Sequence, residues 1–464
     1  MAGIGTLFLV IAVNNSMSPY RSFGLTNPAA PNALVAEAAV ALMKTGTSKA
    51  DSLLGYGNGR SYGDSCLNGQ GAVVDMRSMN RILAFDPVSG VIEAESGVLL
   101  SDVIAHAAPH GFFPAVVPGT QFVTLGGAIA NDVHGKNHHR RGTLGSHVEA
   151  LMLLTSDGRV HRLDRRSRSR LFAATIGGMG LTGLILSATI RMMRVSSLDI
   201  EEEITPFRSL DGYFDLAEAA DAINEYAVAW IDQPATGRRE GRGLLIAGNH
   251  AEYGARKASA AGTLLRVPFQ MPVGVINRPF LKIFNSAYRW KKGRTRGKHR
   301  TGYQGFFFPL DCVADWNRLY GPKGLYQHQS VIPESEARRT IPALLAAVRE
   351  AGHGSFLTVL KRFGDMASPG LISFPRPGYT LTLDFPNRGA ETLALMERLD
   401  RITIGAGGAV NPYKDARMDA DVFAASFPNW RELEAVRDPT FMSDFWARTA
   451  KILDVRRGTV EAEE

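Results

Sequence analysis

The chain contains 464 residues, of which 45% are hydrophobic and 21% are charged. This length allows two or three domains, and this composition excludes a largely disordered protein. The chain has two cysteines, Cys66 and Cys312, which excludes a disulfide framework and favours a reducing, cytoplasmic location. The formal net charge of +7 suits an anionic partner.

Residues 1–19 begin with a short apolar run, MAGIGTLFLVIAV, that has no Lys or Arg before it. The run is too short to span a bilayer and lacks the basic start of a secretory signal. We interpret residues 1–19 as a disordered or artefactual extension, with Met17 as an alternative start. No later stretch has the roughly 20 uninterrupted apolar residues of a transmembrane helix.

Residues 20–195 alternate short strands and helices, which predicts one α+β domain. Residues 32–45 are expected to form a helix between Pro31 and Gly46, and residues 53–64 a loop. Further strands are expected at 71–76, on both sides of the turn at 87–90, and at 180–195, with a helix ending at Gly111 and a β-hairpin over 147–163.

Residues 196–405 are richer in strands and predict a sheet covered on one face by helices. The expected strands lie at 226–232, 243–248, 302–311, 355–364 and 378–386, and the expected helices at 335–352 and 392–407. Residues 266–300 fit neither a regular strand nor a regular helix. A helical tail ends the chain.

Three glycine-rich stretches interrupt the first domain: GYGNGRSYGD (55–64), PGTQFVTLGGAIAND (118–132) and TIGGMGLTG (175–183). Successive backbone N–H groups in such loops form an anion-binding concavity, and GGAIAND predicts a helix N-terminus, which also favours phosphate. The spacing is not that of a Rossmann fingerprint. A plain glycine turn is the alternative for any single stretch, but three of them in one domain favour a phosphate cradle.

The block HGKNHH, residues 134–139, suggests a metal site, a nucleic-acid patch or part of this cradle. Zinc sites use Cys and His at tetrahedral spacing, no Cys is near, and the adjacent His138 and His139 would diverge in a strand. Nucleic-acid patches interleave basic residues with exposed aromatic rings, which this block lacks. We therefore expect no metal and no nucleic acid, with His134 and Lys136 facing the ligands and His138 and His139 structural.

Together, GRSYGD, PGT-x4-LGGAIA-x-D-x-HGKNHH and GG-x-GLTG resemble the FAD-binding oxidoreductases of the vanillyl-alcohol-oxidase type. More narrowly, the chain from about residue 20 onward resembles the flavin subunits of decaprenylphosphoryl-β-D-ribose 2′-epimerases. Stretches such as AWID, FLTVLKRFG, LISFPRPGYTLTLDFP and KDAR carry this narrower resemblance, and HGKNHH and the KDAR lysine are its specific parts. GRSYGD alone is shared with many flavin oxidases.

The resemblance implies a two-domain α+β fold of the vanillyl-alcohol-oxidase, or PCMH, type with an antiparallel-sheet substrate domain. The FAD domain is expected at 20–195, the substrate domain at 196–405, and a segment that returns to the FAD domain with the active-site lysine at 406–464. FAD is expected to be non-covalent, because the first glycine loop carries Tyr62 and no His. The residues expected to hold FAD are Gly55, Gly57, Asn58, Gly59, Arg60, Ser61, Tyr62, Gly63, Gly119, Thr124, Gly126, Gly127, Asn131, His134 and Ile185.

By the same motif matching, Lys414 and His134 are the expected catalytic residues. The expected substrate residues are Lys136, Trp230, Gln329, Lys361, Thr380 and Thr382. From the residues alone, Lys414 could equally be a solvated lysine paired with Asp415, and Trp230 a core residue.

Several positions depart from the pattern of the close relatives. Thr382 replaces a Cys and Thr380 an Asn on the pocket strand, Phe307 replaces a Tyr, and Asn411 replaces a flavin-contacting Tyr for which Tyr413 can substitute. These changes leave the flavin chemistry intact and the identity of the sugar or lipid open. Because a Thr hydroxyl is a far poorer nucleophile than a thiolate, covalent agents directed at that Cys are expected to inhibit weakly.

The resemblance implies hydride transfer to the flavin from the 2′-carbon of a polyprenyl-phosphoryl-β-D-ribose, with a lysine of lowered pKa as the base. The 2′-keto sugar would be reduced by a separate NAD(P)H-dependent short-chain reductase, which completes epimerisation to the arabinose form for the cell envelope. The alternatives are a soluble aldonolactone or alditol oxidase, and a flavin-binding partner of the reductase that has lost turnover. The presence of Lys414 and His134 argues against the last.

Residues 289–300, RWKKGRTRGKHR, contain seven Lys or Arg and follow the apolar RPFLKIFNSAY. This pattern suits a peripheral site on an anionic membrane, on the inner face of the plasma membrane, where each basic residue adds about 1 kcal/mol. A solvated loop is the alternative. The arginines of 165–170 are interpreted as solvated.

Overall fold

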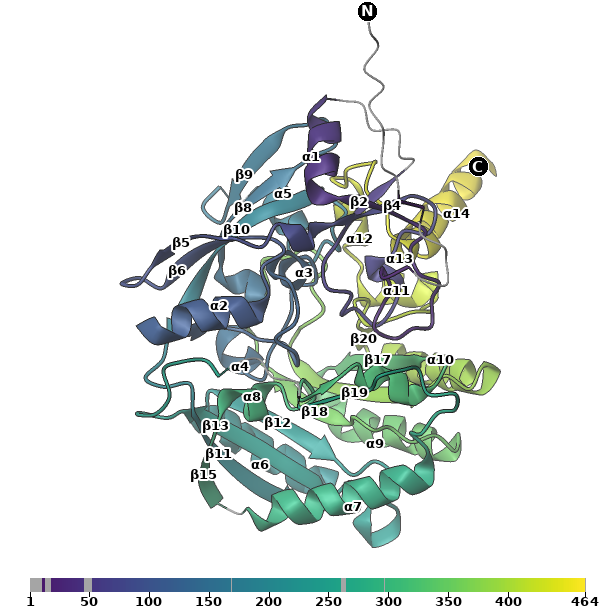
Figure 1. Cartoon of the computed structure of the whole chain (residues 1–464). Coiled ribbons are helices and arrows are strands. Elements are labelled where there is room, and N and C mark those ends of the chain that lie inside the picture. Colours follow the sequence, from purple (N-terminus) through teal and green to yellow (C-terminus); the bar gives the residue numbers. More distant parts are fainter. Residues whose placement is uncertain are drawn as a thin grey trace, which may run out of the picture.

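The computed structural model describes residues 11–12, 18–45, 52–167, 169–259, 264–295 and 297–463. The extension expected at residues 1–19 lies outside the described residues except for Ser18, Pro19 and the short strand β1 (Ile11–Ala12), which pairs with β2 (Asn32–Val35). In Figure 1 the N-terminal strands and the C-terminal helices occupy one half of the molecule, and a large sheet with its helices occupies the other. The candidate site lies between these halves.

The N-terminal half contains two sheets. In the first, β2 and β3 (Leu53–Tyr56) both run parallel to β4 (Ala72–Asp75). The second is antiparallel, with strand order β5-β6-β10-β8-β9 and β7 paired to β10. Its strands are β5 (Ile82–Asp86), β6 (Val91–Glu95), β7 (Phe112–Pro114), β8 (Val148–Leu154), β9 (Val160–Asp164) and β10 (Leu184–Arg194). The hairpin predicted over 147–163 is therefore confirmed.

Two expectations for this half are wrong in part. The helix expected over 32–45 starts later, because residues 32–35 form β2 and only Ala36–Thr45 are helical (α1). The loop expected from residue 53 begins after a strand, β3, whose Leu53 and Leu54 are fully buried. Both strands are short and apolar, and a short apolar run carries no period that separates strand from helix.

Four further short helices in the N-terminal half and its connections are α2 (Leu100–Ala107), α3 (Leu125–Ala130), α4 (His138–Arg141) and α5 (Arg170–Thr175). A fifth, α8 (Tyr303–Phe307), packs on the large sheet of the other half. The segment predicted as a strand at 302–311 contains α8, so that prediction is wrong. Its run of aromatic residues shows no alternation, and Phe306 and Phe307 are both buried.

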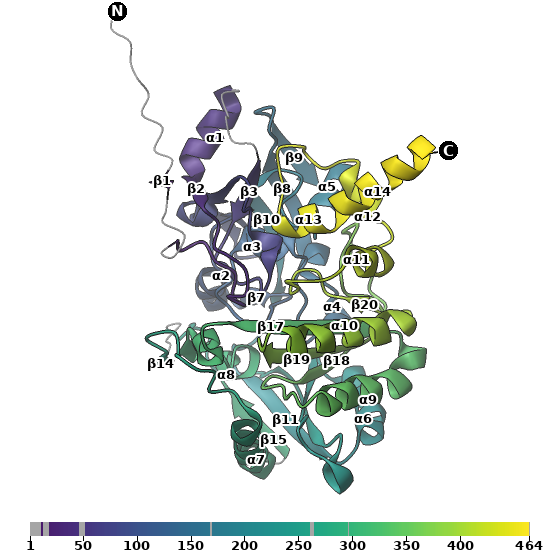
Figure 2. The ribbon, with the colours of Figure 1, turned by 90° about the vertical axis from the view of Figure 1, so that its right-hand side faces the viewer.

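The larger half is built on an eight-stranded antiparallel sheet of order β15-β11-β13-β12-β18-β19-β17-β20. The strands are β11 (Ile200–Phe207), β12 (Tyr226–Ile231), β13 (Gly243–His250), β15 (Gly297–Thr301), β17 (Leu325–Ile332), β18 (Val359–Phe363), β19 (Gly378–Pro386) and β20 (Ala409–Val410). A separate pair, β14 (Leu265–Arg266) and β16 (Val313–Ala314), is parallel. Figure 2 shows the C-terminal helices beside the N-terminal strands, above this sheet.

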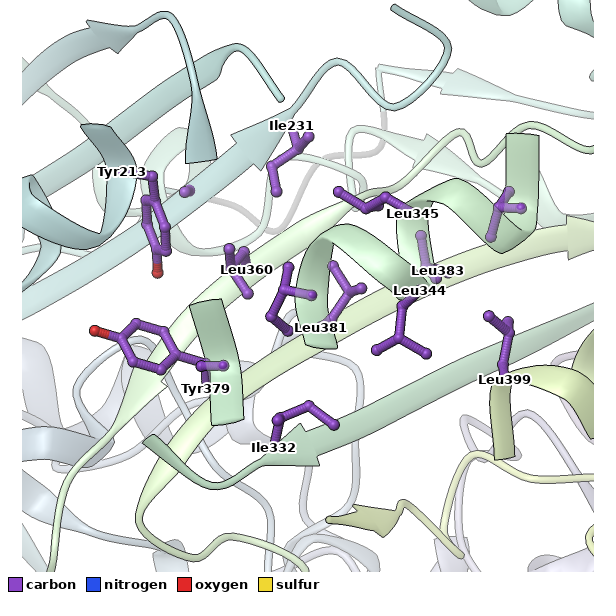
Figure 3. Packing of buried hydrophobic residues seen from close by; sticks show 14 of the residues in the cluster. Tyr213, Ile231, Ile332, Leu344, Leu345, Leu360, Tyr379, Leu381, Leu383 and Leu399 are labelled. Carbon is purple, nitrogen blue, oxygen red and sulfur yellow. The ribbon is translucent and has the colours of Figure 1, made fainter. Parts of the chain in front are cut away.

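One face of the large sheet is covered by α6 (Leu210–Ile223), α9 (Glu334–Glu350) and α10 (Ala390–Gly405). Figure 3 shows the core between them, where Leu381 and Leu383 of β19 meet Leu344 and Leu345 of α9. Because successive side chains in a strand point to opposite faces, the alternate residues of β19, Thr380, Thr382 and Asp384, face the other way. That second face is turned toward the N-terminal half, and along β19 it is polar.

Residues 266–300, expected to be irregular, contain the 17-residue helix α7 (Arg278–Arg294). Asn277 caps its N-terminus by accepting a hydrogen bond from the N–H of Phe280, and Pro279 lies in the first turn, both common at helix starts. The sequence concealed this helix because its apolar residues lie on opposite faces, with Leu281 buried and Ile283 and Trp290 exposed. No helix among the described residues is both long and apolar enough to cross a bilayer.

The C-terminal segment leaves the large sheet at β20 and packs against the N-terminal half through α11 (Ala420–Ser426), α12 (Trp430–Glu434), α13 (Asp444–Arg448) and α14 (Ala450–Glu463). Arg448 holds this return in place. Its guanidinium contacts Asp64 at 2.7 Å, directly after the first glycine loop, and Asp415 at 2.7 Å. Both carboxylates are buried, so this one cation joins two segments about 350 positions apart in the chain.

We expect Arg448→Ala to lower the free energy of unfolding by about 3 to 5 kcal/mol, because it leaves the buried Asp64 without a cation and Asp415 with only the more distant Arg417. Arg338→Ala is the matched control, since Arg338 pairs with Asp211 and Asp215 at an exposed site. That change is expected to cost less than about 1 kcal/mol. Denaturant unfolding of both variants measures the difference, and equal losses would contradict the clamp.

Candidate active site

Two cavities adjoin between the halves. The large cavity measures about 530 Å³ and the small cavity about 270 Å³. They share a border formed by Pro118, Gly119, Asn131, Val133, Leu310, Leu357, Tyr413 and Lys414. Lys414 therefore stands where the two cavities meet.

The first glycine loop lines the large cavity with backbone. Within the described part of the chain, no hydrogen bond takes up the backbone N–H groups of residues 58–62. Gly59 has φ +58°, and a Cβ there would lie 2.2 Å from the Tyr56 hydroxyl and 2.6 Å from the carbonyl oxygen of Arg21. The loop thus needs glycine to adopt this shape, and its free donors suit an anion such as a diphosphate.

Arg60 adds a charge to this cradle. Its guanidinium lies 5.7 Å from the centre of the Phe23 ring and 5.8 Å from that of Phe122, while its buried Nε has no hydrogen-bond partner among the described residues. Asn58 also ties the loop to Phe122, by donating to its carbonyl at 2.7 Å. A buried cationic donor without a partner indicates that an anionic group is meant to bind here.

The second glycine stretch forms the facing wall. Thr124 caps α3 by accepting a hydrogen bond from the N–H of Gly127 at 3.2 Å. Gly57 packs against that threonine so closely that a Cβ would lie 2.3 Å from its hydroxyl. The two loops, 67 positions apart in the chain, therefore approach each other at Gly57, and the lack of a side chain there keeps the adjoining space open.

Most of the predicted cofactor residues line the large cavity: Gly55, Gly57, Asn58, Gly59, Arg60, Ser61, Tyr62, Gly119, Thr124, Gly127 and Asn131. His134 lines the small cavity instead. Three others line neither. Gly63 lies against the backbone carbonyl of Asp415, where a Cβ would be 1.5 Å from the oxygen, and Gly126 packs on Ser96. Ile185 is a core residue of β10.

The predicted substrate residues meet through the register of the large sheet. Trp230 pairs with Val359, Val359 with Thr382, and Thr382 with Gln329, so one row crosses four strands. All four side chains line the small cavity, together with Lys136 and Lys361. Thr380 lies one row further, opposite Lys361, and is fully buried beneath the cavity wall.

A chain of hydrogen bonds fixes the small cavity's polar groups. The N–H of Tyr413 donates to Oδ1 of Asn411, so the amide Nδ2 of Asn411 faces Oε1 of Gln329, at 2.9 Å. The Nε2 group of Gln329 then donates to Thr380 Oγ1 at 2.9 Å and to Nε2 of His134 at 3.1 Å. His134 Nε2 is therefore an acceptor, and the neutral ring carries its proton on Nδ1.

This tautomer bears on the charge of Lys361. Nδ1 of His134 lies 3.2 Å from Nζ of Lys361, and an N–H there needs a lone pair to receive it. This proximity favours the neutral amine of Lys361, which also donates to the carbonyl of Gly135 at 3.3 Å. Burial, reinforced by Lys414 and Lys136, holds the pKa of Lys361 well below its ordinary value. Burial, with Lys361 and Lys414 nearby, does the same to the pKa of His134.

Two further lysines approach the same space. Burial lowers the pKa of Lys136 to about 8, and its Nζ lies 4.4 Å from the centre of the Phe306 ring and donates to the Phe306 carbonyl. Burial also lowers the pKa of Lys414, although the carboxylate of Asp384 opposes that shift. An anion entering here would meet three amines whose pKa values burial lowers, and it would favour the charged form of each.

Lys414 is not paired with its neighbour Asp415. Asp415 is engaged by Arg448 at 2.7 Å and by Arg417 at 3.5 Å, on the side away from the cavities. Lys414 instead faces the ring of Tyr62, 5.9 Å away, and the field of Asp384. The interpretation of Lys414 as a solvated lysine is therefore wrong.

Asp384 and Gln327 are site residues that the sequence analysis missed. Gln327 lines the large cavity and donates to Asp384 at 2.5 Å, and burial raises the pKa of this carboxyl. Both residues follow from strand alternation, since Gln327 lies two positions before Gln329, and Asp384 two after Thr382. The other lining residues that the sequence analysis missed gave no such signal: Cys66, Phe122, Met179, Trp316 and Tyr288.

The histidines of HGKNHH separate as expected, although on a helix and not on a strand. His134 lines the small cavity. The ring centre of His138 lies 4.6 Å from that of Phe363, and Nδ1 of His139 lies 3.6 Å from Oδ1 of Asp221. Among the described residues, no three His, Cys, Asp or Glu side chains are grouped to hold a metal ion.

Comparison with known proteins agrees with this geometry. A family sequence model described as FAD binding domain matches residues 35–164. The decaprenylphosphoryl-β-D-ribose oxidase of Mycolicibacterium smegmatis is 36% identical over 417 residues, 86% of this chain and 89% of its own. An uncharacterized protein in the mprA 5′ region of Streptomyces coelicolor is 33% identical over 73% of this chain and 96% of its own.

The L-gulonolactone oxidase of Bos taurus is 31% identical over 136 residues, 29% of this chain and 30% of its own. The predicted α+β fold of the FAD-binding type is confirmed, FAD is the cofactor, and the large cavity with its free donors and Arg60 fits it. The chain belongs to the decaprenylphosphoryl-β-D-ribose oxidase family of FAD-dependent oxidoreductases.

Proposed function

We propose that this enzyme oxidises the 2′-hydroxyl of a polyprenyl-phosphoryl-β-D-ribose to the 2′-keto sugar. The observation that carries this proposal is the small cavity, in which Lys136, Lys361 and Lys414 converge beside aromatic walls. Three amines in one cavity suit a phosphate, because an opposite charge stabilises the protonated forms that burial disfavours. Trp230 and Tyr288, whose ring centres are 5.1 Å apart, offer an apolar path for a prenyl chain.

Lys414 is the proposed base. FAD, when bound, supplies the acceptor for the hydride that leaves the alcohol carbon. Nζ of Lys414 can take the hydroxyl proton only as a neutral amine, and its burial raises the neutral fraction at a given pH. Its place on the border of both cavities supports this role, and Tyr62 and Asp384 set its position and charge.

The cofactor is proposed to be non-covalent. Cys66 is a nucleophilic side chain that lines the large cavity, and burial raises the pKa of its thiol to about 12. The thiolate needed for attachment is thus absent at neutral pH. Returning the keto sugar to an alcohol of the opposite configuration requires a hydride donor, which we assign to a separate NAD(P)H-dependent short-chain reductase.

We expect Lys414→Met to lower kcat by about 10²- to 10⁴-fold while FAD is retained, because a positioned base is lost. In the unchanged enzyme, kcat/KM should rise with pH until Lys414 is neutral and level off below the ordinary lysine pKa near 10.5. Lys323→Met, at an exposed site, is the control. Full activity of Lys414→Met would refute the assignment.

Asp384→Asn tests the same base through its neighbour. Removing the carboxylate that raises the pKa of Lys414 should move the rising limb of the pH profile toward lower pH. A merely structural role of Asp384 would change kcat without moving the limb. The profile of the unchanged enzyme, measured with equal flavin content, is the reference.

Lys136→Met tests the substrate class. We expect KM for polyprenyl-phosphoryl ribose to rise about 10- to 100-fold, because hydrogen bonds to a charged group contribute about 1.5 to 3 kcal/mol. Lys323→Met should leave it unchanged. Wild-type turnover of free alditols or aldonolactones with no requirement for the lipid phosphate would instead identify a soluble sugar oxidase.

A further inference from the structure

The segment from Leu264 to Arg294 exposes an unusual amount of apolar surface. Of the fifteen large apolar side chains that are exposed in the described residues, six lie between residues 264 and 290. They are Leu264, Leu265, Phe269, Val273, Ile283 and Trp290. Isolated exposed apolar residues need no explanation, whereas a cluster on one segment indicates a contact surface.

This surface is held in place and is not a loose loop. Met271 and Val275 donate backbone hydrogen bonds to the carbonyls of Arg318 and Leu319, at 3.2 and 2.9 Å. Asn285 anchors α7 from beneath by donating to the buried Asp232 at 3.0 Å. The exposed side chains are therefore presented by an ordered scaffold.

Helix α7 has two functional faces. Leu281 and Asn285 are buried, and Tyr288 of the same side lines the small cavity. Ile283 and Trp290, seven residues apart and so on one stripe, are 74% and 62% exposed on the opposite side. The helix thus separates the small cavity from whatever contacts its outer stripe.

Positive charge surrounds the stripe. Residues 278–300 contain nine Lys or Arg and no Asp or Glu. Lys282 precedes Ile283, Lys291 follows Trp290, and the guanidinium of Arg294 lies 4.1 Å from the centre of the Trp290 ring. In the described part of the chain, no carboxylate lies within ion-pair distance of these three cations, whereas Lys292 on the inner side pairs with Glu202.

We propose that the outer stripe of α7, with Ile283 and Trp290 at its centre and Lys282, Lys291 and Arg294 around it, docks on an anionic lipid bilayer. A Trp beside aliphatic residues, ringed by Lys and Arg, matches an interfacial helix, in which the apolar stripe enters the headgroup region and the cations meet lipid phosphates. Protein interfaces, by contrast, are depleted in Lys. The proposal deepens the proposed function, since a prenyl-linked substrate would pass from that bilayer to the cavity beneath the same helix.

Tryptophan fluorescence gives a residue-specific test. FAD-loaded protein is mixed with vesicles of phosphatidylcholine containing about 30% phosphatidylglycerol. The emission of Trp290 is expected to shift to the blue and to be quenched by brominated lipid. Trp290→Phe should keep vesicle binding and lose this signal, because the other four tryptophans are less exposed. An unchanged response in Trp290→Phe would overturn the assignment.

Co-sedimentation measures the contribution of charge. Since each basic residue contributes roughly a fivefold factor at an anionic surface, K282Q/K291Q/R294Q should lower the partition coefficient about a hundredfold. The control R159Q/R162Q/R166Q removes three exposed charges at and after the β8–β9 hairpin, and it should leave the partition coefficient unchanged. Ile283→Glu should weaken binding, and Ile223→Glu, 75% exposed on α6, should not.

The outcomes separate this surface from the proposed reaction. Wild type and variants are assayed together on detergent-solubilised substrate, where equal rates show that the cavities are intact. Vesicle binding without turnover would remove the proposed function and keep the docking surface. Equal co-sedimentation of all variants with vesicles would overturn the docking surface. So would variants that still bind vesicles but lose a dimer on size exclusion.

Discussion

Repulsion and dehydration among three buried lysines, Lys136, Lys361 and Lys414, form the constraint around which the site is organised. Burial in one small cavity disfavours their charged forms, and the hydrogen bonds from Tyr413 through Gln329 to His134 orient Nδ1 of His134 toward Lys361, which favours the neutral amine there. A phosphate would relieve this constraint, because it favours the protonated amines. The site is therefore prepared for an anion beside an alcohol, which is the combination that a phosphoryl-linked sugar provides.

The fold sustains this arrangement by joining distant segments. Helices α6, α9 and α10 take the apolar face of the large sheet, which leaves the polar face of β17, β18 and β19 to close against the N-terminal half. Gly63 lets the backbone of Asp415 approach the first glycine loop, and Arg448 joins Asp64 to Asp415 across the same junction. Lys414 is placed by these neighbours, so its position depends on the C-terminal return as much as on either sheet.

The sequence predicted the glycine cradle and Lys414 because glycine spacing and short motifs are local properties. It did not predict the Arg448 clamp or the carboxylate of Asp384 near Lys414, since these side chains meet only after the chain has folded. Strand alternation would have identified Asp384 as a site residue, because it lies two residues after Thr382 and so on the same face of β19. Helix α7 was not predicted because it has apolar residues on two faces, and the exposed stripe hides the helical period of the buried stripe. Ile283 is exposed, whereas Leu281, two residues earlier, is buried.

Anaerobic addition of decaprenylphosphoryl-β-D-ribose to the FAD-loaded protein tests the account most directly. The flavin absorption band near roughly 450 nm should bleach in proportion to the enzyme, and Lys414→Met should bleach far more slowly. Added free alditols and aldonolactones should leave the band unchanged. A band that persists with the lipid-linked ribose and bleaches with a free sugar alcohol or lactone would contradict the account.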